Sequence, residues 1–329
     1  MLLSGSLAFS PAHFLTFILY SSFVPFATMP LLVDNPVTPS VKEAANISIF
    51  DESLLTEHDK KYDLLVTVDH RFIGLSIVDS KERKFYAFEA YHFQQSLSTE
   101  QLAQKIAVLP NQSNILKEVD FTNVSVQVVN RNYTFVPSVL YREENIRQYY
   151  FLNHSMNSAI EIKADTVRAY DLINVFSVSE TILSALKKIF TRFTCRHHLS
   201  SLLEAVRMEN SRDEHKNISL HFHSGFIDLI VTEGRKLLLC NTFSYKSPED
   251  ALYYLLFVCE QLSINTEKIT VTIFGELEKG AALHHLFDQY FRNISFSQRP
   301  KSATFTYGFD AIPEHFYFSV FSQILNASH

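Results

Sequence analysis

Phe72-Ile73-Gly74-Leu75-Ser76-Ile77-Val78-Asp79 occurs a second time, in altered form, as Phe226-Ile227-Asp228-Leu229-Ile230-Val231-Thr232-Glu233. Each copy is followed by an Arg-Lys pair, Arg83-Lys84 and Arg235-Lys236, and then by an apolar stretch, a polar break and a helical pattern. The offset is 154 residues at the phenylalanines and 152 at the Arg-Lys pairs, so one turn has lost two residues. A repeat of this length is one supersecondary unit used twice, and it predicts a duplicated fold.

The residues around each copy predict the same order of elements. Segments rich in β-branched and aromatic residues predict three strands in each copy: 64–68, 72–78 and 85–93, then 218–222, 226–232 and 236–243. Ser98 and Ser247 are expected to cap the helices that follow, over 99–107 and 248–262. Pro110 is expected to break the first helix. Further strands are expected at 124–129 and 268–274, and a further helix at 279–291.

The chain has 329 residues, enough for two domains. We expect four parts: an apolar extension at 1–28, an irregular lead-in at 29–60 with an edge strand at 46–50, a first lobe at 61–208 and a second lobe at 217–329. The first lobe contains an inserted αβ segment, in which 167–176 is expected to be extended and 143–151, 180–190 and 198–208 helical. A final amphipathic helix is expected at 312–325.

Composition excludes several classes of protein. Apolar residues make up 47% of the chain and support a large core. The net charge is −6 with no basic face, which argues against nucleic acid as a partner. The three cysteines, Cys195, Cys240 and Cys259, are odd in number and far apart, which indicates reduced thiols and a cytoplasmic protein.

The first 28 residues contain no Lys, Arg, Asp or Glu. A secretory signal has a positive start, and Pro11, His13 and Pro25 interrupt the apolar run that a spanning helix needs. We expect Met29 to be the true start and no membrane association. The alternative is export or anchoring through residues 7–28, as a secreted glycoprotein with Asn-x-Ser/Thr sites. We interpret the eight such sites as a chance product of composition.

Three antiparallel strands, a helix, a strand and a helix, all used twice, resemble the actin-like ATPase superfamily, including its small pilus-assembly and secretion proteins. Asn46 to Ser53, the strand pattern from Leu64, and Phe135 to Tyr141 resemble more closely an uncharacterised domain-of-unknown-function family of Bacteroidetes proteins with that fold. The resemblance covers roughly residues 45–325. It implies an α/β class with mixed sheets, a duplicated actin-like (ribonuclease H-like) fold and two lobes around a cleft.

In the superfamily, ATP binds between the lobes on glycine-rich loops, whereas this chain has only seven glycines. The first hairpin, 68–72, keeps Asp69 but lacks a glycine. The second, 222–226, keeps Gly225 but has His223 at the place of an aspartate. The third loop, from 274, keeps Gly275 but has Glu276 in place of a second glycine. Side chains at such positions obstruct the approach of backbone N–H groups to phosphate.

We therefore expect a non-catalytic actin-like scaffold or protein-binding module, a pseudo-enzyme without a cofactor. Its protein partner is expected to use the cleft or an exposed strand edge. The alternative is an ATP-binding enzyme, an ATPase or kinase with atypical phosphate loops and with ATP and Mg as cofactors. The residues expected to hold the nucleotide in that case are Asp69, Ser224, Gly225 and Gly275.

His221 and His223 share one strand face, with Cys240 expected on a neighbouring strand. Cys195, His197 and His198 add further donors, as do His284 and His285, but the spacing matches no compact zinc motif. We therefore expect half-exposed histidines near a cleft and no metal site. Asp228 is expected on a strand face, and Asp79 and Glu233 in solvated turns. We expect no catalytic pair of carboxylates.

Overall fold

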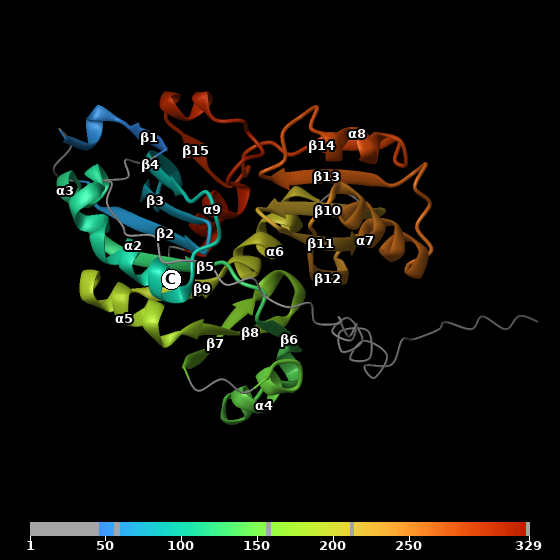
Figure 1. Ribbon diagram of the computed structural model, residues 1–329, viewed down its shortest axis with the longest axis horizontal. Coiled ribbons are helices and arrows are strands. Elements are labelled where there is room, and N and C mark those ends of the chain that lie inside the picture. Colours follow the sequence, from blue (N-terminus) through green and yellow to red (C-terminus); the bar gives the residue numbers. More distant parts are fainter. Residues whose placement is uncertain (1–45, 56–59, 156–158, 211–213, 327–329) are drawn as a thin grey trace, which may run out of the picture.

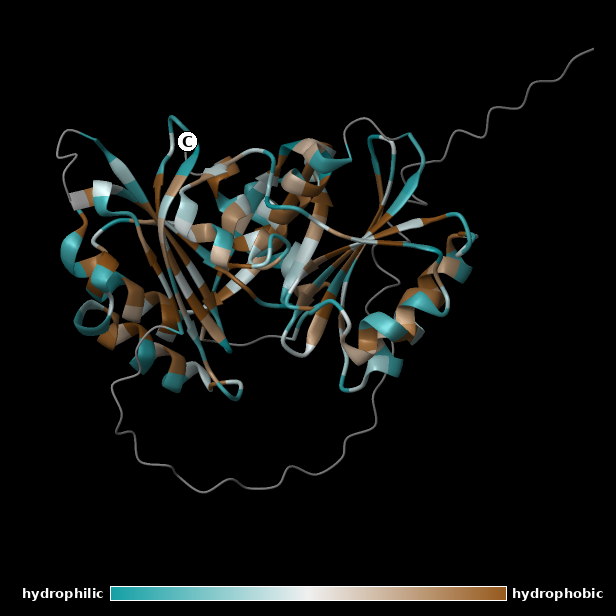
Figure 2. Ribbon diagram, turned by 90° about the horizontal axis from the view of Figure 1, so that it is seen from above, coloured by the Kyte–Doolittle hydropathy of each residue, from teal (hydrophilic) through white to brown (hydrophobic). Residues whose placement is uncertain are grey.

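The computed structural model describes residues 46–55, 60–155, 159–210 and 214–326 (Figure 1). The expectations for residues 1–28 and for Met29 lie outside these ranges. Two mixed sheets lie side by side, with helices on their outer faces and between them (Figure 2). None of the helices in the described ranges has the length and hydropathy needed to cross a lipid bilayer.

The first sheet has the order β1-β4-β3-β2-β5-β9, and β15 also pairs with β4. Its strands are β1 (Ile47–Phe50), β2 (Tyr62–Asp69), β3 (Phe72–Asp79), β4 (Lys84–His92), β5 (Phe121–Val128), β9 (Thr194–His197) and β15 (Thr304–Phe305). The first three long strands are antiparallel, and β5 and β9 continue the sheet in parallel. The expected edge strand at 46–50 is confirmed as β1.

The second sheet repeats this topology in the order β12-β11-β10-β13-β14. Its strands are β10 (Lys216–His223), β11 (Phe226–Glu233), β12 (Lys236–Ser244), β13 (Thr270–Gly275) and β14 (Asn293–Phe296). The register of the second hairpin of each sheet shifts at equivalent places, between Ile77 and Val78 and between Val231 and Thr232. The duplication predicted from the sequence is confirmed.

The turn lengths account for the two missing residues. Asp79 pairs with Lys84 across a four-residue loop, whereas Glu233 pairs with Lys236 across a two-residue loop. Gly234 lies in the shorter loop with a φ of +55°, a conformation that glycine adopts without strain.

Helices cover the faces of the two large sheets. The first sheet packs on one face against α2 (Thr99–Gln112) and α5 (Glu180–Ile189), and the second against α7 (Pro248–Gln261) and α8 (Ala282–Asp288). Two further helices, α6 (His198–Glu209) and α9 (Phe318–Ser322), contact each other between the sheets (Figure 1). The apolar side chains of α6, among them Leu199 and Leu202, pack against Ile230 and Phe274 of the second sheet.

Some helix ends differ from the expectations. Ser98 caps α2 as predicted, but the helix continues through Pro110 to Gln112, and a short helix, α3 (Asn114–Glu118), follows. The prediction that Pro110 breaks the helix is wrong because Ile106 and Leu109 are buried in the core and hold the last turn in place.

The segment inserted between β5 and β9 forms a small sheet of its own, with the order β6-β8-β7. It consists of β6 (Tyr133–Pro137), β7 (Ile160–Val167), β8 (Leu172–Ser179) and α4 (Ile146–Phe151). The prediction of one extended stretch over 167–176 is wrong, because a helical turn at Arg168–Tyr170 and a positive φ at Asp171 reverse the chain there.

The C-terminal segment also differs from its prediction. In place of one helix over 312–325, the chain forms a turn at Tyr307–Ala311, the five-residue α9, and a final turn at Gln323–Asn326. This segment packs on the inner face of the first sheet, where Phe309 and Phe321 contact Phe85 and Phe88. The chain after β14 therefore returns from the second sheet to the first.

A buried carboxylate of the small sheet anchors the start of α6. Asp165 of β7 accepts hydrogen bonds from the backbone N–H of His197 (2.7 Å) and from the hydroxyl of Ser200 (2.8 Å). The Nδ1 atom of His197 in turn accepts a hydrogen bond from the N–H of Leu199 (3.3 Å). These contacts fix the first turn of α6 and the position of His198.

Asp165 gives a testable pH dependence. Burial raises its pKa to about 6, whereas an aspartate in an unfolded chain titrates near ~3.9. Its stabilising contribution is therefore fully present below about pH 4 and is lost as the pH rises through about 6. Relative to Asp165→Asn, we expect the wild type to lose on the order of 2–3 kcal/mol of unfolding free energy over this range, measured by urea denaturation. A difference that stays constant with pH would contradict this assignment.

Candidate functional site

Two hairpin turns, one from each sheet, meet at a small cavity between the lobes. The cavity has a volume of about 90 Å³. Three of the four residues predicted for nucleotide contact line it, namely Asp69, Ser224 and Gly275. Gly225 lies beside Ser224 in the turn between β10 and β11, with a φ of +100°. The structure thus brings the two predicted hairpins and the third loop together at one place.

The first hairpin turn is closed by its own aspartate. Oδ1 of Asp69 accepts a hydrogen bond from the backbone N–H of Arg71 (2.8 Å). Nδ1 of His70 lies 2.7 Å from the carbonyl oxygen of Leu97, which ties the turn to the start of α2. Asp69 therefore stabilises the turn in which it lies.

The backbone of the third loop is occupied by contacts within the protein. The N–H of Gly275 donates to the carbonyl of His315 (2.8 Å), and the N–H of Glu276 donates to the carbonyl of Phe222 (3.1 Å). A Cβ atom on Gly275 would lie 2.2 Å from the carbonyl oxygen of Phe222. The close packing of this loop against β10 therefore requires glycine at 275.

Acidic and basic side chains share the cavity wall. Asp69 and Glu276 are the acids, and the bases are Arg71, His92, His221 and His223. Burial raises the pKa of Glu276, and burial lowers the pKa of His92. Nε2 of His92, at the end of β4, lies 2.6 Å from the hydroxyl of Tyr317. The first sheet and the C-terminal segment therefore meet at this cavity.

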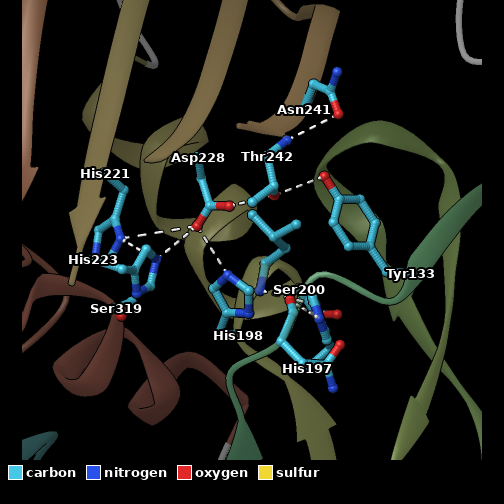
Figure 3. Close-up of polar contacts among 12 residues, drawn as sticks. Tyr133, His197, His198, Ser200, His221, His223, Asp228, Asn241, Thr242 and Ser319 are labelled. Carbon is cyan, nitrogen blue, oxygen red and sulfur yellow. Dashed lines mark hydrogen bonds and ion pairs between the residues drawn. The ribbon is translucent and has the colours of Figure 1, made fainter. Parts of the chain in front are cut away.

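Beside the cavity lies a buried cluster of histidines around Asp228 (Figure 3). Oδ2 of Asp228 is 2.9 Å from Nε2 of His198 and 2.8 Å from Nε2 of His223. Its other oxygen accepts a hydrogen bond from the hydroxyl of Thr242 (2.5 Å). His221 completes the cluster, with Nδ1 2.7 Å from Nε2 of His223. The side chains of His198 and Asp228 are fully buried.

Four elements supply this cluster. The helix α6 between the lobes provides His198, β10 provides His221 and His223, β11 provides Asp228 and β12 provides Thr242. Tyr133 of the small inserted sheet joins through its hydroxyl, 3.1 Å from that of Thr242. The cluster therefore connects the second sheet to the inner helix and to the insertion.

The electrostatics of the cluster keep Asp228 ionised. Burial alone would raise its pKa, but the charges and hydrogen bonds of His198 and His223 outweigh burial and hold the pKa well below its usual value. Burial, together with the neighbouring His223, lowers the pKa of His221 well below its usual value. A buried carboxylate is thus surrounded by imidazoles.

The interpretation of His221 and His223 as half-exposed is wrong, since His221 is 3% exposed and little of the His223 side chain is accessible. Cys240 lies on β12, two strands from the histidines. The sequence contains one signal that could have predicted the cluster: a two-residue turn between β10 and β11 sets a register that places Asp228 directly opposite His221. The contribution of His198 depends on how α6 docks, which no local pattern reveals.

Two groups of side chains in the described ranges have donor atoms close enough together to hold a metal ion. One is His198, His223 and Asp228. The other is on the surface and consists of His284, His285 and Asp288. Asp79 accepts hydrogen bonds from the N–H groups of Lys81 and Glu82 and acts as a turn residue.

Solved structures with a similar fold include two that match most of this chain. A protein with an actin-like ATPase fold and unknown function from Bacteroides thetaiotaomicron has a TM-score of 0.65 and 19% identity, with 74% of this chain and 93% of that chain covered. A chain of the PilM–PilN type IV pilus biogenesis complex has a TM-score of 0.59 and 10% identity, with 81% and 98% covered. These similarities confirm the predicted actin-like fold.

Among curated proteins, no sequence matches this chain. A family model described as a protein of unknown function, DUF3822, matches residues 51–294. This match spans more than half of the chain and confirms the resemblance to an uncharacterised family. The protein therefore belongs to the DUF3822 family of proteins of unknown function.

Proposed function

We propose that this protein is a non-catalytic actin-like scaffold that binds another protein. One observation carries the proposal: the place where the two hairpins and the third loop meet is a cavity of about 90 Å³. Pockets for ligands of nucleotide size have volumes of roughly 300–1,000 Å³. A nucleoside triphosphate does not fit without separation of the lobes.

The chemistry of the cavity supports the same conclusion. Phosphate is held by free backbone N–H groups, but those of Gly275 and Glu276 already donate to carbonyls. The carboxylates of Asp69 and Glu276 line the cavity beside Arg71, so the wall lacks the uniformly positive charge that favours a triphosphate. The alternative function, an ATP-binding enzyme, is favoured by the actin-like fold and by the cavity that Asp69, Ser224 and Gly275 share.

An aromatic patch on the second lobe is the surface that we assign to the partner. We define it as Phe243 of β12 and Tyr253, Tyr254 and Phe257 of α7. Tyr253 and Phe257 are 63% and 45% exposed, and their rings stack. Tyr254 stacks on Phe243 and so extends the patch to β12.

Two features support a protein as the ligand of this patch. Aromatic side chains are enriched in protein interfaces, where they supply most of the binding energy. Among the described strands β12 pairs with β11 alone and is an edge strand, the kind of strand to which extended peptides add. The similar pilus protein is likewise part of a complex with a second protein.

We further propose a cytoplasmic setting, which the free thiols support.

Nucleotide binding can be tested by thermal stability. We expect Mg-ATP to leave the melting temperature unchanged in a thermal-shift assay, because the cavity is too small to hold it. The assay would detect binding, since a ligand at 100 times its Kd stabilises the fold by ~2.7 kcal/mol. A rise in melting temperature that disappears in Gly225→Val would support the ATP-binding alternative instead.

Gly275 and Gly225 differ in how closely the surrounding backbone packs against them. Gly275 and Gly225 both have positive φ, so alanine at either costs about 1–2 kcal/mol. Only at 275 does the new Cβ meet a backbone atom. We expect Gly275→Ala to lose at least about 1 kcal/mol more unfolding free energy than the matched Gly225→Ala, measured in urea. Equal losses would show that the third loop is not packed in this way.

Mutation of the aromatic patch tests whether it binds a protein partner. We expect affinity purification from native lysate to recover one specific protein with the wild type, and the double variant Tyr253→Ser and Phe257→Ser to lose it. Tyr307→Ser is the matched control, because Tyr307 is 88% exposed and lies outside the patch. Recovery of the same protein by all three forms would exclude the patch as its binding surface.

A further inference from the structure

The histidine cluster contains contacts that hydrogen bonds alone do not satisfy. Nε2 of His223 lies 2.8 Å from Oδ2 of Asp228 and 2.7 Å from Nδ1 of His221. A ring nitrogen either carries a proton or offers a lone pair. If Nε2 of His223 carries a proton and donates it to Asp228, then Nδ1 of His221 is unprotonated and faces that Nε2 atom with its lone pair.

In that arrangement the proton of a neutral His221 resides on Nε2, which is buried and has no hydrogen-bond partner among the described residues. If His221 instead donates to His223, the lone pair of His223 is already used and Asp228 faces a nitrogen without a proton. A cation removes the competition at Nε2 of His223, because it accepts lone pairs from nitrogen and oxygen alike. The ring protons that ligation leaves on Nε2 of His221 and on Nδ1 of His198 have no partner among the described residues in either arrangement.

We propose that His198, His223 and Asp228 bind one divalent transition-metal ion. Nε2 of each histidine and Oδ2 of the aspartate converge from three different elements, within 4.8 Å of one another. Imidazole nitrogen with one carboxylate oxygen is a donor set that suits zinc and its first-row neighbours. Calcium and magnesium prefer sites made of oxygen ligands.

Two of the three distances between the ligand atoms require only a small expansion. Zinc bonds of about 2.0–2.2 Å in tetrahedral geometry separate the ligand atoms by roughly 3.3 Å. The distances from Oδ2 of Asp228 to the two nitrogens are 2.8 and 2.9 Å, so side-chain shifts of roughly 0.5 Å accommodate the ion.

The surroundings supply the other parts of such a site. Thr242 donates a hydrogen bond to the second oxygen of Asp228 and fixes the orientation of this carboxylate. The cavity between the lobes is lined by His221 and His223, whereas the side chains of His198 and Asp228 are fully buried, so His223 is the proposed ligand through which the site adjoins the cavity. Nδ1 of His221, 3.9 Å from Oδ2 of Asp228, adjoins the site as a fourth donor.

The test uses the full chain, stripped with EDTA, incubated with Zn²⁺ and passed over a desalting column. We expect elemental analysis to find one zinc per chain in the wild type and less than a tenth of that in Asp228→Asn and in His223→Gln. The matched control is the double variant His284→Ala and His285→Ala, which removes the surface group and should keep one zinc.

Two further measurements keep the outcome decisive. Melting curves in EDTA show whether each variant is folded, and Co²⁺ added to the wild type should give the visible absorption of a low-symmetry nitrogen and oxygen site, which a purely structural cluster would not produce. Wild type without zinc, or Asp228→Asn with a full equivalent, would overturn the proposal. Loss of zinc in the surface variant alone would assign the ion to the surface group and overturn it as well.

Discussion

Each of the two large sheets carries apolar side chains on both of its faces, and this constraint decides where the rest of the chain lies. Outer helices bury one face of each sheet. The inner faces need a common layer, which α6 and the C-terminal segment provide. Because α6 lies against β11, its first residue, His198, meets Asp228, and the polar cluster forms at the end of an otherwise apolar interface.

Much of the fold could be predicted because the information is local or duplicated. Alternating β-branched and aromatic residues identified the strands, and the capping residues Ser98 and Ser247 identified the helix starts. The repeat then supplied the topology. The prediction of one helix in the C-terminal segment failed for two reasons. Its aromatic residues are buried on several sides, so they follow no amphipathic period. In addition, Tyr317 adopts a positive φ that interrupts a helix.

The site was harder to predict than the fold. The sequence placed Asp69, Ser224 and Gly275 on loops that the resemblance brought together, and these residues do line one cavity. Strand alternation showed that His221 and His223 share a face, but it did not show that this face is the buried one. Burial there depends on α6, which lies outside both copies of the repeat.

The return of the chain from β14 to the first sheet bears on how the protein folds during synthesis. In many two-lobed proteins the N-terminal unit folds while the rest is still being made. Here the residues that cover Phe85 and Phe88 are Phe309 and Phe321, close to the C-terminus. We therefore expect the inner apolar face of the N-terminal sheet to stay exposed during synthesis until almost the whole chain has left the ribosome.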